Sequence, residues 1–234
     1  ILNQILAIPE SARLTNIVFM GMGEPLDNYD NVLAALEILT SPWGMAWSPT
    51  RITLSTAGIT PRLEQLIEAT KVHIAVSLHN PFHDQRAEIM PVEKAYPIRE
   101  LTDMLRRHDF SGQRRLSFEY ILMEGLNDTA AHIRELRRLL NGLNCRINII
   151  RFHRIPDSPY FSPPRQKMEA FRDRLTAGGI HTTIRASRGE DIQAACGLLS
   201  TAEAMRRAEQ RRSQDHDTAE GDTHHPTTKQ TTER

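Results

Sequence analysis

Cysteine is scarce in this chain, because only Cys145 and Cys196 occur among its 234 residues. Two thiols are too few for a disulfide framework, and they fit a reducing, cytoplasmic environment. No apolar run is long enough to span a bilayer. The opening residues "ILNQILAIPE" lack the basic leader and the cleavage site of a signal peptide. These absences favour a cytoplasmic protein with no membrane partner.

Net charge is also lacking, since 29 Lys and Arg residues balance 29 Asp and Glu residues. This balance does not argue for nucleic acid, although a neutral chain can still carry a basic face. Two interpretations stay open for the arginines of the second half. They line one RNA-binding surface, or they are scattered and solvated. The arginines concerned are Arg146, Arg151, Arg154, Arg185 and Arg188.

Several catalytic motifs are missing as well. The sequence holds no GxxxxGK[ST] phosphate loop, no H-E-x-x-H, no paired C-x-x-C and no serine in a nucleophile elbow. We therefore expect no metal ligands within this chain. Hydrophobic residues make up 39% and charged residues 25%, which is typical of a soluble globular protein.

Strand-like and helix-like segments alternate along the chain. Helices of this length between strands indicate βαβ units and a parallel sheet of the α/β class. The absence of a Rossmann fingerprint favours a partial (βα)-barrel over a dinucleotide-binding domain. The predicted strands are 15–20, 51–57, 72–79, 114–123, 145–153 and 181–187, and the predicted helices are 28–40, 60–70, 97–109, 128–142, 165–179 and 190–210.

The domain organisation follows from where apolar residues stop. We expect one core over residues 1–200, a terminal helix over 201–210 and a disordered tail over 211–234, because the tail has almost nothing apolar to bury. The chain starts without Met, inside a segment with helical spacing. We therefore expect an N-terminally truncated fragment of a longer protein.

Small and polar residues follow the predicted strands, in "GMGEP", "STAG", "SLHN" and "RFHRIPDSP". In parallel barrels these strand ends meet at one rim, where ligands bind. Gly21 and Gly23 permit unusual backbone angles, and Pro25 restricts Glu24 before it. Each residue alone fits a turn or a cap. Together they predict a polar pocket for an amino-acid-like or nucleoside-like ligand.

The two cysteines receive different interpretations. Cys196 precedes Gly197 and follows Arg185 and Arg188, which would favour a thiolate if they lie close in space. A small buried side chain is the alternative, because most free cysteines are buried. Cys145 begins a predicted strand, at the end opposite the rim, and we interpret it as structural.

Taken in order, the segments "MGMGEPLDN", "STAG", "VSLHNP…R…MP", "FEYILMEGLND" and "ASRGEDIQAACGLL" resemble the radical-SAM adenine C2-methyltransferases (RlmN-like, with the Cfr resistance enzymes as relatives). The resemblance runs from about Ile1 to Ser200. It implies a partial radical-SAM barrel that methylates 23S rRNA and tRNA with S-adenosylmethionine and a [4Fe–4S] cluster. An electron-donating reductase is the implied partner, and we expect a monomer.

The resemblance also implies roles for single residues. Cys196 would carry the methyl group: one S-adenosylmethionine methylates it, and a second is cleaved to a 5′-deoxyadenosyl radical. That radical removes a hydrogen from the S-methyl group, and the methylene radical adds to adenine C2. A cysteine suits this covalent step because its thiolate is a good nucleophile. The implied contacts to S-adenosylmethionine are Gly23, Glu24, Ser55, Ser77, Leu78, His79 and His153, the last replacing the family's Asn.

The family holds its cluster with a C-x3-C-x2-C loop, which this sequence lacks. We expect those ligands upstream of Ile1, and we expect the fragment alone to be inactive. Two alternatives stay open. One is a barrel enzyme that uses polar acid–base chemistry through His79 and Glu119. The other is a noncatalytic RNA-binding module.

Overall fold

A computed structural model describes residues 1–21, 23–112, 114–153 and 158–185 of the chain. Its strands form one parallel sheet in which each strand pairs with the next along the chain. The predicted α/β class and parallel sheet are therefore confirmed. The strands are β1 (Ile17–Phe19), β2 (Ile52–Thr56), β3 (His73–Ser77), β4 (Leu116–Leu122), β5 (Arg146–Arg151) and β6 (His181–Ile184).

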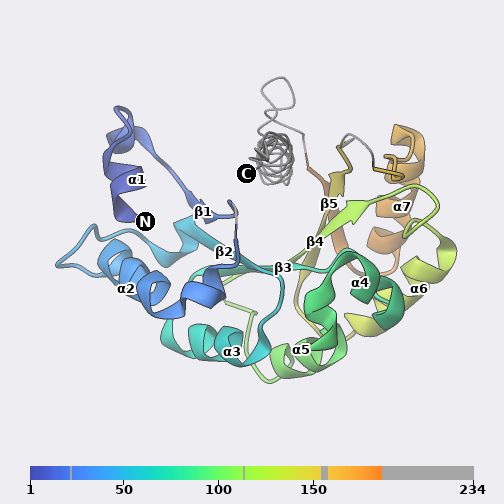
Figure 1. The fold of residues 1–234 in the computed structure, drawn as a ribbon, viewed down its shortest axis with the longest axis horizontal. Helices are drawn as coiled ribbons and strands as arrows, with labels where there is room; N and C mark the ends of the chain where they lie inside the picture. The colour runs from blue at the N-terminus through green and yellow to red at the C-terminus, as the bar shows by residue number, and fades with distance from the viewer. Residues whose placement is uncertain (22, 113, 154–157, 186–234) are drawn as a thin grey trace, which may run out of the picture.

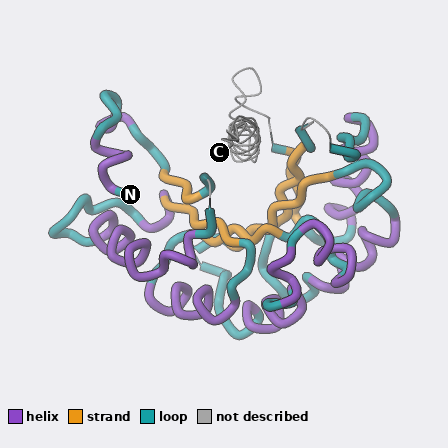
Figure 2. Tube along the Cα trace, viewed as in Figure 1, coloured by secondary structure: helices purple, strands orange, loops and turns teal. Residues whose placement is uncertain are grey.

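The sheet is strongly curved, and helices follow its outer side. Figure 2 shows the strands as an inner arc and the helices as an outer arc, as expected for a partial (βα)-barrel. Helix α1 and strand β1 lie at one end of the arc, and α7 lies at the other (Figure 1). The helices are α1 (Leu2–Leu6), α2 (Tyr29–Thr40), α3 (Thr60–Ala69), α4 (His83–Ile89), α5 (Ile98–Leu105), α6 (Ala130–Leu139) and α7 (Arg165–Ala177).

Strand residues alternate between two faces, since neighbouring side chains point to opposite sides of a sheet. Val76, Phe118 and Ile147 are neighbours in one row and are fully buried in the core beneath the helices. The next row, on the concave face, is polar throughout. It consists of Ser77, Glu119, Asn148 and Thr183.

The predicted helices and strands recur with small shifts at their ends. Helix α3 begins at Thr60, as predicted, and Ile59 occupies its N-cap position. Thr60 lies inside the helix and its hydroxyl donates to Gly58 O, so it does not accept from the helical N–H groups. Helix α4 was not predicted from the sequence. The predicted helix 190–210, the tail and Cys196 lie outside the described residues.

No helix in the described part of the chain is long and apolar enough to cross a membrane.

Candidate functional site

The predicted site residues come together at one edge of the sheet. Ser55 is in β2 and Ser77 ends β3, and Gly23 and Glu24 lie in the loop that follows β1. His153 lies just beyond β5. Because all the strands are parallel, their carboxyl ends share this edge, where ligands of such folds bind. These residues therefore lie along one edge of the sheet, and their contacts to a ligand stay a prediction.

Glu24 ties two of the rim loops together. Its Oε1 accepts from Leu26 N at 3.1 Å, and its Oε2 accepts from Ala57 N, beyond the end of β2, at 2.6 Å. Pro25 begins a short 3-10 helix, which restrains the chain after Glu24. The carboxylate thus has a structural role of its own, which the sequence did not predict. Each oxygen keeps a second lone pair for a ligand.

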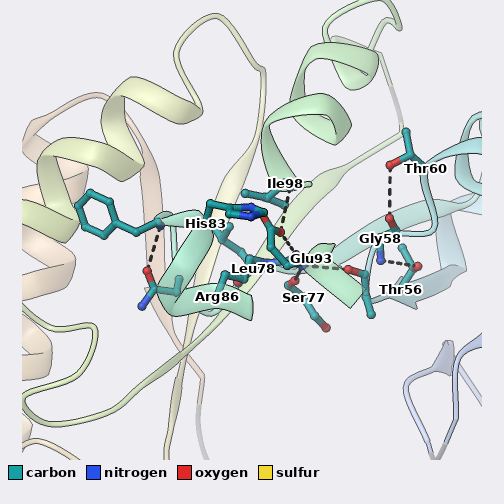
Figure 3. A network of polar contacts seen from close by, with 12 residues as sticks. Thr56, Gly58, Thr60, Ser77, Leu78, His83, Arg86, Glu93 and Ile98 are labelled. Carbon is teal, nitrogen blue, oxygen red and sulfur yellow. Dashed lines mark hydrogen bonds and ion pairs between the residues drawn. The ribbon is translucent and has the colours of Figure 1, made fainter. Parts of the chain in front are cut away.

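Arg86 of α4 is the largest fully buried side chain of the described residues, and it hydrogen-bonds to the backbone at the ends of β2 and β3 (Figure 3). Its Nε donates to Leu78 O at 3.0 Å. Its Nη2 donates to Ser77 O at 2.8 Å and to Ala57 O at 2.9 Å. A single guanidinium therefore fixes three backbone carbonyls on two adjacent rim loops.

The charge of Arg86 is balanced by Glu93, which is equally buried and accepts from Nη1. Glu93 also accepts from Ile98 N at 3.0 Å, at the start of α5, and it contacts His83 Nδ1 at 2.8 Å (Figure 3). Because the ion pair and the hydrogen bonds satisfy both charged groups, their burial is tolerated. The sequence contained this signal in the "R…MP" part of its third segment, but no role was predicted for it.

Leu78 and His79 contribute through their backbone more than through their side chains. The side chain of Leu78 is buried, its N–H donates to Glu119 O and its carbonyl accepts from Arg86. His79 has a left-handed backbone (φ 54°), and its Nδ1 accepts from Ile121 N at 3.1 Å. Burial, with the nearby charge of Arg86, lowers the pKa of His79 to about 4. The imidazole is therefore neutral at pH 7.

The concave polar row forms a connected network around Glu119. Glu119 Oε1 accepts from Asn148 Nδ2 at 2.7 Å and from Ser117 Oγ at 3.2 Å. Thr183 Oγ1 donates to Asn148 Oδ1 at 2.9 Å. Glu119 Oε2 lies 3.7 Å from Arg185 Nη1, but it is buried without a hydrogen-bond partner among the described residues. The polar Asn inside the apolar run "INII" was the sequence signal for this network, and it was missed.

The arginines proposed for one basic surface do not share one edge. Arg146 begins β5 and Arg151 ends it, so the strand separates them. Arg185 lies beside Glu119, while Arg154 and Arg188 lie outside the described residues. The single basic surface is thus wrong for the pair Arg146 and Arg151, because they occupy opposite ends of one strand and therefore opposite edges of the sheet.

Cys145 behaves as the structural cysteine that the sequence predicted. It directly precedes β5, at the edge away from the rim, and it packs partly buried against the core. Burial raises the pKa of its thiol to about 12, so the reactive thiolate is scarce at neutral pH.

The rim fits a polar ligand such as S-adenosylmethionine. The hydroxyls of Ser55 and Ser77 are half-buried and make no hydrogen bond to other described residues. Gly23 has a φ of +90°, and nothing lies within 4 Å of the place that a side chain would take there. With the free oxygen of Glu119, the concave edge offers several unused polar atoms and an open backbone approach.

The described residues do not fit an iron–sulfur cluster. In the described ranges, no group of three His, Cys, Asp or Glu side chains converges in a way that could hold a metal. The whole sequence also lacks a C-x3-C-x2-C triad. The expectation that the ligands lie upstream of Ile1 stays a prediction.

Comparison with known proteins gives close relatives. A "Probable dual-specificity RNA methyltransferase RlmN" of Bacteroides fragilis is 57% identical over 202 residues, which are 86% of this chain and 59% of that protein. A "Dual-specificity RNA methyltransferase RlmN" of Syntrophus aciditrophicus is 47% identical over 193 residues, 82% of this chain and 56% of its own length. The chain therefore spans less than two thirds of the length of these relatives.

Two solved structures are also similar. A radical SAM methyltransferase from Sphaerobacter thermophilus superposes with a TM-score of 0.78 at 42% identity, over 84% of this chain and 60% of that one. A domain of a pyruvate-formate lyase-activating enzyme from Bacteroides vulgatus gives a TM-score of 0.57 at 16% identity, over 74% of this chain and all of that one. The second likeness shows the fold alone.

The family model of the Radical SAM superfamily matches residues 1–140, which include β1 to β4 and all the predicted rim residues except His153. This match covers more than half of the chain, and the parallel half-barrel with its polar rim agrees with it. The chain belongs to the Radical SAM superfamily.

Proposed function

We propose that the protein containing this chain methylates adenine C2 in 23S rRNA and tRNA, using S-adenosylmethionine. One observation carries this proposal. A chain of the Radical SAM superfamily presents unpartnered hydroxyls and a free buried carboxylate oxygen at its rim, and it is 57% identical to a relative named as a dual-specificity RNA methyltransferase. The name of that relative gives RNA as the substrate, and the two kinds of RNA and the adenine C2 position follow from the family resemblance.

The rim residues would hold the cofactor, which supplies both the methyl group and, once reduced, the radical. The Ser55 and Ser77 hydroxyls are free to hydrogen-bond its polar groups. Gly23 allows close approach, while Glu24 can accept a further hydrogen bond from an ammonium group. His153 is half-buried beside the same edge and is our remaining proposed contact.

Leu78 and His79 would act by shaping this rim. The backbone N–H and carbonyl of Leu78 already have partners, and Nδ1 of His79 already accepts a hydrogen bond. Arg86 would act as a positioning residue, because it fixes the carbonyls of Ala57, Ser77 and Leu78 and is itself fully buried.

Cys196 is our proposed methyl carrier. Its thiolate would accept a methyl group and then present it to C2 of the adenine. Because C2 is not nucleophilic, ordinary polar methyl transfer does not modify it. The second cysteine, Cys145, is unsuited to this role because burial raises its pKa to about 12.

The acid–base alternative is weakened by the surroundings of His79. A general base works best with a pKa near the operating pH, whereas the pKa of His79 is lowered to about 4. Its Nδ1 is also occupied by Ile121 N. In addition, Glu119 Oε1 is held by Asn148 and Ser117.

The test is methyl transfer to RNA by the full-length protein carrying Cys196→Ala, with Cys145→Ala as the matched control. We expect Cys196→Ala to abolish methylation while S-adenosylmethionine still binds. Cys145→Ala should retain activity. Full activity of Cys196→Ala would overturn the carrier role. Binding of RNA without any binding of S-adenosylmethionine would instead support the noncatalytic alternative.

A further inference from the structure

A second polar region lies at the opposite edge of the sheet, where the strands begin. A cavity of about 590 Å³ is lined there by the loop that precedes β4 and by the first residues of β3, β4, β5 and β6. His73 begins β3, Arg146 begins β5 and His181 begins β6. Because the strands are parallel, this cavity and the cofactor rim lie at opposite ends of the barrel. None of the residues proposed to bind S-adenosylmethionine lines it.

The lining of this cavity is strongly cationic. It includes Arg114, Arg115 and Arg146 together with His73 and His181, and it includes no Asp or Glu. None of the three arginines forms an ion pair with another described residue. Burial, followed by the charges of Arg115 and Arg146, lowers the pKa of His73, which agrees with a positive potential at this edge.

Arg114 is the most unusual member of the cluster. It is only 8% exposed, and its Nη1 donates to Ile67 O at 2.9 Å. Its Nε and Nη2 are buried and have no hydrogen-bond partner in the described part of the chain. Leaving such buried donors unsatisfied is unfavourable, because they lose their hydrogen bonds to water without gaining others. A bound anion would supply both the missing acceptor and the missing counter-charge.

Arg114 also lines a second cavity of about 580 Å³, whose lining residues carry both signs of charge. That neighbour carries Glu68 and Asp109 alongside Lys71 and His108. The Asp109 carboxylate is occupied by the N–H and the hydroxyl of Ser111. Neither Glu68 nor Asp109 forms an ion pair with the three arginines in the described part of the chain. The cavity on the side of Arg115 and Arg146 has no acidic lining residue, so we expect the anion there.

We propose that the cavity lined by Arg114, Arg115 and Arg146 binds a phosphate group, at a site separate from the cofactor rim. Guanidinium groups match the planar spacing of phosphate oxygens and bind them with charge-assisted hydrogen bonds. The phosphate belongs either to the backbone of an RNA strand or to a free phosphate ester. Binding of an RNA backbone phosphate rests on the proposed function, whereas binding of a free phosphate ester does not.

The test uses the full-length protein with the double substitution Arg115→Gln and Arg146→Gln. Both side chains are at least partly exposed, so the fold should tolerate their replacement. The matched control is Arg134→Gln, which removes an exposed arginine from α6, on the outer arc (Figure 1). Circular dichroism checks that all the variants are folded. If the double substitution unfolds, Arg115→Gln alone replaces it, because that side chain is exposed, and weaker binding is expected for it as well.

Two binding measurements distinguish the sources. Calorimetric titration with inorganic pyrophosphate reports a free phosphate ester, and anisotropy of a labelled single-stranded RNA reports a strand. For either source, we expect binding about tenfold weaker in the double variant and unchanged in Arg134→Gln. If the phosphate belongs to RNA, the salt dependence of RNA binding should also be weaker in the double variant than in the wild type. The slope of log K against log salt should be smaller in magnitude by about 0.7 for each phosphate that the variant no longer neutralises.

Equal binding of both probes by the double variant and by Arg134→Gln would overturn the proposal. Binding is measured here without methyl transfer, so this result would leave the proposed methyltransferase activity intact. Conversely, failure of the methyl-carrier role in the cysteine experiment would not change the pyrophosphate result.

Discussion

Two buried arginines at opposite ends of the same barrel differ in every contact that they make. Arg86 is fully buried, donates to three backbone carbonyls and pairs with Glu93. Arg114 is nearly as buried, but it donates to one carbonyl and leaves two nitrogens without a partner among the described residues. A buried charge with all its partners belongs to the architecture, whereas one without them is a candidate for binding. The comparison distinguishes a structural arginine, which supports the proposed cofactor rim, from an arginine at the opposite edge whose unused donors are available to a ligand.

The largest expected effect on stability comes from removing Arg86 from its ion pair with Glu93. Arg86→Met leaves Glu93 buried without its partner and releases the carbonyls of Ala57 and Ser77. Removing one member of a buried ion pair costs about 3–5 kcal/mol. We expect this decrease in the free energy of unfolding, measured by urea denaturation. A decrease below about 1 kcal/mol would contradict the role that we assign to Arg86.

The pH dependence of stability tests the surroundings of His79, which lies near Arg86. Burial and then the charge of Arg86 place the pKa of His79 at about 4, below the ordinary 6.5. As the pH falls through this window, the unfolded chain binds a proton before the folded one does. Stability should therefore fall from pH 6.5 to pH 4, by at most about 1.4 kcal/mol per pH unit. His79→Asn, which tolerates the left-handed backbone, should reduce this slope. Parallel profiles for the two proteins would contradict the assignment.

A smaller effect is expected at Gly58, beside the carbonyl of Ala57. Gly58 has a φ of +113°, and an added Cβ would lie 2.6 Å from Leu101 Cδ1. Gly58→Ala should lower the free energy of unfolding by more than about 1 kcal/mol. Gly112→Ala is the matched control, because its backbone angle is ordinary and nothing lies within 4 Å of the added Cβ. Similar decreases in both variants would rule out the proposed strain.

The smallest effect is expected for the unpartnered arginine. Arg114→Met removes one hydrogen bond, but it also removes two unsatisfied donors and a charge that burial disfavours. The free energy of unfolding should change by less than about 1 kcal/mol, in contrast to Arg86→Met. Added pyrophosphate should raise the melting temperature of the wild-type protein only. A decrease as large as that of Arg86→Met would show that Arg114 is structural.

Much of the fold could be predicted from the sequence, because strand and helix periodicities alternate clearly and parallel strands bring their ends to one edge. Helix α4 was missed because its sequence, "HDQRAEI", has only two apolar side chains to mark a buried stripe. The rim residues were named from strand ends and from the family resemblance, and their placement at one edge agrees with that prediction.

The contacts of the site could be predicted far less well. Arg86 donates a hydrogen bond to Ala57 O, 29 residues away in the sequence, and Asn148 donates one to Glu119, also 29 residues away. Such pairings depend on the register between strands and on how α4 packs behind them, which periodicity does not specify. The cationic cavity was missed for the same reason, because Arg114 and Arg115 precede β4 whereas Arg146 begins β5. Cys196 lies outside the described residues, and its role stays a prediction.

The central claim is that the cofactor rim and the phosphate cavity are separate sites at opposite edges of the sheet. Its most direct test is the affinity of the full-length protein for S-adenosylmethionine, compared between two double variants. Ser55→Ala with Ser77→Ala removes the free hydroxyls of the rim, and Arg115→Gln with Arg146→Gln alters the opposite edge. We predict that the serine variant binds about tenfold or more weakly, since two hydrogen bonds to the cofactor are removed. The arginine variant should bind like the wild type. Weaker binding in the arginine variant, with unchanged binding in the serine variant, would contradict the account.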